Sequence, residues 1–109
     1  MNQIFDPVTF NASLFKHGNS KFIFDGRLFV RDDKAWLEVG CVETVIIPIV
    51  DHGFVDRILE VVPCLVGGEY LYDDSVLLNG DLDFRDGNFS IISIESGTLN
   101  RDDEGEFVF

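Results

Sequence analysis

Two tyrosines and several acidic side chains in the second half of the chain are the residues best suited to molecular recognition. Tyr70 and Tyr72 stand beside Glu69, Asp73 and Asp74 in the sequence. Tyrosine is enriched at protein interfaces, and carboxylates attract partners rich in lysine and arginine. The alternative is a strand that buries one tyrosine, with the acids in the flanking turns. The predicted partner-binding residues are Glu69, Tyr70, Tyr72, Asp73, Asp74, Asp81 and Asp83.

Catalytic and metal-binding patterns are weak in this sequence. Asp51 and His52 form the one acid–histidine neighbour pair, but adjacent residues rarely face each other and no activated nucleophile accompanies them. Gly67-Gly68 is too short to cradle a phosphate group. The acidic pairs in the predicted turns lack the Asp-x-Asp-x-Asp-Gly spacing of a calcium loop. The sequence therefore favours a protein that is not an enzyme and that holds no metal and no cofactor.

The charge of the chain is strongly negative and uneven. It carries 20 acidic and 8 basic side chains, for a formal net charge of −12. Residues 1–54 hold five Lys and Arg against seven Asp and Glu, whereas residues 55–109 hold three against thirteen. Such a chain repels nucleic acid and anionic lipid and attracts basic proteins. The other interpretation is that the acids only keep a small hydrophobic domain soluble.

Length and cysteine usage indicate one soluble domain. A chain of 109 residues is near the commonest domain size, so we treat residues 1–109 as a single domain. Cys41 and Cys64 are enough for one disulfide, but they lie in apolar runs without a metal or redox spacing, where free cysteine behaves as a small buried hydrophobe. We expect no signal peptide and no membrane span, and hence a cytoplasmic protein. The sequence leaves the oligomeric state open.

An internal similarity dominates the pattern of the chain. The segment 22–32 recurs as 76–86, and in both copies the even positions are apolar except for a central glycine, Gly26 or Gly80, before a closing Arg-Asp pair. This period of two is typical of a half-buried strand. Either the chain contains a duplication, or two hairpins reach the same pattern independently. The poor match of the segments that follow the copies favours the second reading.

The first half is predicted to contain a helix, a hairpin, a buried strand and a second helix. A glycine on the apolar face of a strand marks a bend or a close approach, and Trp36 is a candidate cover for Gly26. Pro48 indicates an edge or a bulge. The predicted elements are a helix from Asp6-Pro7 to Gly18, strands over 21–31 and 35–41 around a turn at 32–34, a strand buried on both faces over 43–50, and a helix over 52–62, capped by Asp51, with a strand over 58–62 as the alternative.

The second half is predicted to be mainly strands and turns. Asp86-Gly87 is a strong hairpin signal. The predicted elements are a bent strand over 64–72, a turn at Asp73-Asp74, strands over 75–85 and 88–95, a turn at Ser96-Gly97, a solvated acidic segment over 100–106 and a short strand over 107–109.

The sequence thus predicts an α+β fold that is predominantly antiparallel β. The strand glycines favour a strongly curved sheet or a partly closed barrel, with an N-terminal helix and a second short helix. For function it favours a small acidic binding or inhibitor protein with a basic protein partner, for example an immunity protein that neutralises a bacterial toxin. The alternatives are a small-ligand-binding β module and a structural or oligomer-forming module.

Overall fold

The structure, a computed structural model, describes residues 3–10, 20–40 and 43–109. This part of the chain contains one α-helix, α2 (Phe54–Val61), and seven strands. The strands are β1 (Gln3–Ile4), β2 (Lys21–Arg31), β3 (Lys34–Val39), β4 (Val45–Ile49), β5 (Tyr72–Arg85), β6 (Asn88–Arg101) and β7 (Gly105–Val108).

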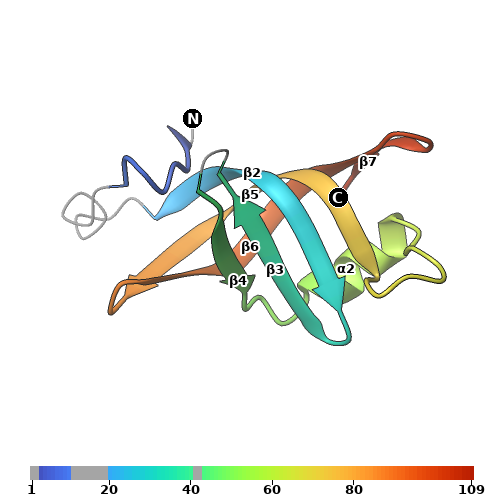
Figure 1. Ribbon diagram of the computed structural model, residues 1–109, viewed down its shortest axis with the longest axis horizontal. Coiled ribbons are helices and arrows are strands. Elements are labelled where there is room, and N and C mark those ends of the chain that lie inside the picture. The colour runs from blue at the N-terminus through green and yellow to red at the C-terminus, as the bar shows by residue number, and fades with distance from the viewer. Residues whose placement is uncertain (1–2, 11–19, 41–42) are drawn as a thin grey trace.

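Five of the strands form a barrel (Figure 1). Their order is β2-β3-β4-β6-β5, and β5 pairs back with β2. The pairings are antiparallel except that of β4 with β6, which is parallel at Ile49 and Ile91. The prediction of a curved, mainly antiparallel sheet is therefore confirmed, but the barrel is closed rather than partly closed. Outside the barrel, β1 pairs with β2 and β7 pairs with β6.

The two similar segments form equivalent hairpins. In the first, β2 turns into β3 at Asp32, which has a φ of 58°. In the second, β5 turns into β6 at Asp86, with a φ of 53°. β2 and β5 are antiparallel neighbours, and Phe24 lies opposite Leu78. Because these two residues also match when the copies are aligned, a local twofold axis through this pair relates the hairpins.

The central glycine of each copy permits a close approach of the returning strand. A Cβ atom on Gly26 would lie 2.5 Å from the carbonyl oxygen of Glu38 on β3. A Cβ atom on Gly80 would collide in the same way with the carbonyl oxygen of Ser93 on β6. Glu38 pairs with the residue after Gly26, and Ser93 pairs with the residue after Gly80. The carbonyl therefore occupies the same position in both hairpins. The glycines therefore allow the strong bend that closes the barrel.

The core is rich in phenylalanine at one end of the barrel. Phe5 follows β1, and its ring centroid lies 5.2 to 5.9 Å from those of several other phenylalanines. The rings that pack together here are Phe5, Phe10, Phe22, Phe24, Phe84 and Phe89. Most of the N-terminal helix predicted up to Gly18 lies outside the described residues, and residues 7–9 form a turn.

The second predicted helix is present, with a different start. It spans α2 and ends before Pro63 as predicted, with Val62 as its C-terminal cap. The N-cap is Gly53 rather than Asp51. The side chains of Phe54 and Ile58 are buried against the barrel. Helix is therefore correct for this segment, and the alternative strand over 58–62 is wrong.

Two predictions for the segment around the start of β5 are wrong. Residues 63–71 form a loop, not a strand, and the loop is closed by a hydrogen bond from the Leu65 N–H to the Leu71 carbonyl, 2.8 Å long. The predicted turn at Asp73-Asp74 is wrong, because both residues belong to β5 and pair with β2. Pairing across the barrel outweighs the local preference of aspartate for turns.

The predicted turn at Ser96-Gly97 is also wrong, because both residues lie within β6. A Cβ atom on Gly97 would collide with the side chains of Leu78 and Phe109, so this glycine makes room for packing. β6 stays paired with β5 through two register shifts. The predicted acidic segment over 100–106 is the end of β6, a turn over 102–104 and the start of β7, and the predicted final strand is confirmed as part of β7.

The apolar run over 43–50 is buried on one face only. Ile47 and Ile49 are buried, but Ile46 is 62% exposed and Pro48 is exposed. Within the described residues no second layer covers the outer face of β4, where Ile46 and Pro48 are exposed, so the prediction of a strand buried on both faces is wrong. The expectation of an edge at Pro48 is confirmed among the described residues, since β4 meets β6 only at Ile49.

Replacement of Gly26 by alanine tests the close approach. The added Cβ forces the backbone of β3 to shift, and we expect Gly26→Ala to lower the free energy of unfolding by about 1–3 kcal/mol. The control is Gly68→Ala, where an added Cβ meets nothing within 4 Å. It should change stability by less than about 0.5 kcal/mol. Urea denaturation measures both, and equal stability of the two variants would contradict the assignment.

Candidate functional site

A groove of about 890 Å³ lies between the outer face of the β3–β4 pair and helix α2. Trp36, Ile46 and Pro48 line it from the barrel. Val55 and Leu59 line it from the helix. The groove therefore has two apolar walls that come from different elements of the fold.

The periodicity of α2 explains the helical wall. Phe54 and Ile58 form one apolar stripe, which is buried against the barrel. Val55 and Leu59, also four residues apart, form a second stripe that turns toward the groove, where Leu59 is 43% exposed. A surface helix requires only one apolar stripe to pack on a protein, and here a second stripe faces the exposed apolar residues of β4. Apolar residues exposed on two facing elements make this groove a candidate site of interaction.

An aromatic cluster of Phe29, Trp36 and Tyr70 stands beside the groove. Phe29 and Trp36 are paired in register on the outer face of the barrel, and their rings stack with centroids 5.8 Å apart. The Tyr70 ring packs edge-on against both, at 5.2 Å from Phe29 and 6.1 Å from Trp36. The chain contains a single tryptophan. On β3 the side chains of Ala35, Leu37 and Val39 point inward, so that of Trp36 points outward and does not cover Gly26.

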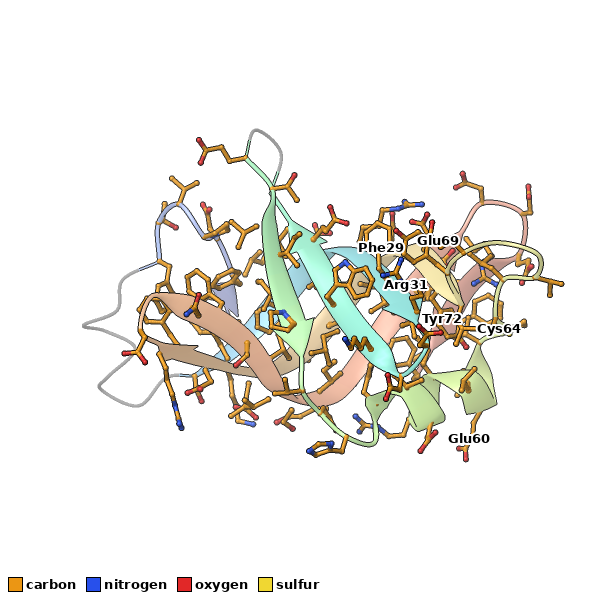
Figure 2. The ribbon with its side chains drawn as sticks, turned by 60° about the horizontal axis from the view of Figure 1, so that its bottom comes forward. Phe29, Arg31, Glu60, Cys64, Glu69 and Tyr72 are labelled. Carbon is orange, nitrogen blue, oxygen red and sulfur yellow. The ribbon has the colours of Figure 1, made fainter. Side chains whose placement is uncertain are left out.

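Two of the predicted partner-binding residues belong to this neighbourhood. Arg31 donates a 2.6 Å hydrogen bond to Glu69, and its guanidinium carbon lies 6.0 Å from the centroid of the Tyr70 ring. Figure 2 shows Phe29, Arg31 and Glu69 grouped together. Tyr70 connects this group to Trp36 and so to the groove.

The rim of the groove carries carboxylates that lack a cationic partner. Asp32 and Asp33 lie in the β2–β3 turn and Asp56 lies in the first turn of α2. Within the described residues none of the three takes part in an ion pair. Lys34, also on the rim, is likewise outside these pairs. The groove is therefore apolar on its walls and negative at its edge.

Asp51 fixes the helical wall to the barrel. Its Oδ2 atom accepts the N–H of Ile94 on β6 at 2.9 Å and a hydrogen bond from Arg57 at 2.7 Å, while Oδ1 accepts the N–H of Gly53 at 3.2 Å. Burial opposes ionisation, but the bonds from Ile94 and Gly53, together with Arg57, outweigh it and lower the pKa of Asp51. The sequence prediction identified Asp51 as a helix cap and missed this long-range contact.

Tyr72 and Asp74 are buried and do not form an exposed surface. The Tyr72 side chain is fully buried, and its hydroxyl donates a 2.6 Å hydrogen bond to the Val62 carbonyl. Burial raises the pKa of Tyr72 to about 12. Asp74 accepts two hydrogen bonds from Arg101, 3.0 and 2.8 Å long. The structure therefore places these two predicted residues in the core, and for Tyr72 this agrees with the alternative of a strand that buries one tyrosine.

The other predicted acids lie on β5 and are paired with cations. Asp73 accepts a hydrogen bond from Arg27. Asp81 lies 3.9 Å from Lys21, and Asp83 lies 3.0 Å from Arg85. None of these acids lines the groove. The seven predicted residues are therefore divided among the core, several ion pairs and the neighbourhood of the groove.

Other kinds of site find no support in the described ranges 3–10, 20–40 and 43–109. No three His, Cys, Asp or Glu residues in them are grouped as a metal site requires. Cys64 is a free, half-buried thiol, and Cys41 lies outside the described residues. No described helix has both the length and the apolar character that crossing a membrane demands.

Comparisons with protein-family models, with curated proteins and with solved structures find no match. The kind of ligand that the groove can bind is therefore inferred from the residues that line it.

The pH dependence of stability tests the role of Asp51. Because its pKa in the folded protein lies below the ordinary 3.8, its contribution is present above about pH 3.8 and is lost as the pH falls through the folded pKa. Asp51→Asn should therefore cost about 1–3 kcal/mol near pH 7, and less in acid. The control Asp56→Asn should change stability by less than about 0.5 kcal/mol. Thermal unfolding at pH 7 and at pH 2.5 measures the stability of each variant. A loss of stability in Asp51→Asn that is as large at pH 2.5 as at pH 7 would contradict this role.

The buried pair of Asp74 and Arg101 gives a second stability prediction. Both side chains are at most 10% exposed, so loss of one partner leaves a buried charge. Asp74→Ala should lower the free energy of unfolding by about 3–5 kcal/mol. The double variant Asp74→Leu with Arg101→Met should recover much of this loss, because it buries no charge. Urea denaturation measures both variants, and a double variant less stable than Asp74→Ala would argue against the assignment.

Proposed function

We propose that the protein is a small acidic binding protein whose groove receives a basic segment of a partner protein. The observation that carries this proposal is the combination of two apolar walls with the carboxylates of Asp32, Asp33 and Asp56, which form no ion pair within the described residues. Apolar walls provide affinity, and the negative rim selects a segment that carries lysine or arginine.

The filled interior of the barrel favours a binding site on the outer surface of the barrel. The interior is filled by buried side chains from all five barrel strands and from α2. Trp36 is the large aromatic residue on the groove wall, and Phe29 and Tyr70 hold its ring. Residues of this type, fixed in position by neighbours, are common centres of binding energy.

The net charge of −12 attracts a cationic partner before the two proteins are in contact. Charges attract an opposite partner over a Debye length of about 8–10 Å and raise the rate of association. Carboxylates already paired with arginine or lysine contribute little to this attraction. The unpaired acids at the rim act on the segment that enters the groove.

Selection from a display library of random twelve-residue peptides tests the proposal. We expect peptides that bind the wild-type chain to be enriched in lysine or arginine next to a leucine or an aromatic residue. Counter-selection against Leu59→Asn removes peptides that bind elsewhere. Failure to enrich any peptide, or enrichment of acidic peptides, would contradict the proposal.

Titration of the fluorescence of Trp36 then locates the binding site, with an enriched peptide synthesised without tryptophan. Asp56→Lys should weaken binding about fivefold and reduce its salt dependence. Asp25→Lys is the matched control, because Asp25 is exposed on β2, away from the groove, and the change in net charge is the same. Equal weakening by both variants would show that the overall charge, not the groove, controls binding.

A further inference from the structure

Strand β7 offers a second surface that is independent of the groove. The barrel strands pair around a closed ring, but β7 lies outside it and pairs along one edge with β6 (Figure 1). Along its other edge β7 faces no strand in the part of the chain that the structure describes. The edge of a strand without a partner presents open backbone donors and acceptors.

The hydrogen-bond pattern identifies the open groups. Gly97 and Phe109 exchange two backbone hydrogen bonds, 2.8 and 3.0 Å long. In an antiparallel ladder such pairs alternate with pairs whose N–H and C=O groups point away from each other. Val108 and Glu106 occupy the alternate positions, so their N–H and C=O groups point away from β6. Val108 is 66% exposed, and Glu106 is exposed.

β7 is short, with four residues, and carries the charge of Glu106, but it lacks several other features that protect an edge. Lysine, proline and β-bulges discourage the addition of a further strand. β7 has the sequence Gly-Glu-Phe-Val, and its pairing with β6 runs without a register shift. The strand is therefore open to a partner.

The charges near β7 decide which partner fits. Asp102 and Asp103 lie in the β6–β7 turn, and Glu106 lies on the strand, all exposed and outside the ion pairs of the described residues. The nearby cation Arg101 is already paired with Asp74 and Glu104. A second copy of this chain would bring the same negative charges together. A segment rich in lysine or arginine would be attracted instead.

We propose that β7 accepts an extended basic segment of a partner protein as an added strand. Main-chain hydrogen bonds to Glu106 and Val108 hold the segment, and its cations face the acids of the β6–β7 turn. This mode of recognition gains affinity from the backbone and selectivity from alternate side chains.

A peptide of eight alternating lysine and valine residues is the probe. We expect its addition to slow amide hydrogen exchange at Glu106 and Val108, measured by NMR, more than at other exposed amides. Val108→Pro removes the outward N–H but leaves the bonds to β6 intact, because proline is tolerated at such an edge position. It should weaken binding at least tenfold, whereas the control Val108→Thr, which keeps the N–H, should bind like the wild type.

Two further measurements keep the proposal falsifiable if Val108→Pro fails to fold. The same peptide methylated on alternate backbone nitrogens should not bind, and Glu106→Lys should weaken binding of the unmodified peptide. Equal binding of the methylated and unmodified peptides would overturn the proposal. So would dimerisation through β7 of the chain alone, detected by sedimentation. A peptide that changes Trp36 fluorescence without protecting Glu106 and Val108 would support the groove and overturn the β7 site.

Discussion

The close approach of backbone to backbone at Gly26 and Gly80 is the constraint on which the rest of the structure depends. At each glycine the returning strand of a hairpin comes so near that a side chain would collide with a carbonyl oxygen. The two bends are related by the local twofold axis between β2 and β5, so they curve the sheet from both sides. A sheet curved in this way can pair its first and last strands and lose most of its open edges.

Closure of the barrel determines which side chains remain outside. Inward positions on every strand fill the interior, and within the described residues the outward side chains of β4 receive no second layer. Ile46 and Pro48 are therefore exposed although the sequence around them is apolar. Helix α2, which Asp51 attaches to β6, stands opposite these residues without covering them. The groove is the space that this arrangement leaves between the outer face of a closed barrel and a helix that is held through Asp51, Phe54 and Ile58.

Local patterns in the sequence predicted the local elements, and the errors lie where contacts are distant. The period of two and the Asp86-Gly87 signal suffice for the hairpins because both depend on neighbouring residues. Asp73 and Asp74 resemble a turn in isolation, but their partners Arg27 and Arg101 lie 46 and 27 residues away. The groove escaped prediction for the same reason, since Trp36 and Leu59 come to line one groove only after the barrel closes. A signal was nevertheless present: exposed β4 residues and a second stripe on α2 are both apolar in the sequence.

The distribution of charge in the fold differs from its distribution along the chain. The excess of acids in residues 55–109 suggests a negative half of the molecule. In the structure, however, cations of β2 lie against those acids: Lys21 pairs with Asp81 and Glu95, Arg27 with Asp73, and Arg31 with Glu69. The antiparallel pairing of β2 with β5 brings the two halves together, and these three cations offset part of the excess of ten negative charges. The attraction for a basic partner therefore depends on the carboxylates left without cations, and at the groove these are Asp32, Asp33 and Asp56, which a count by sequence halves would overlook.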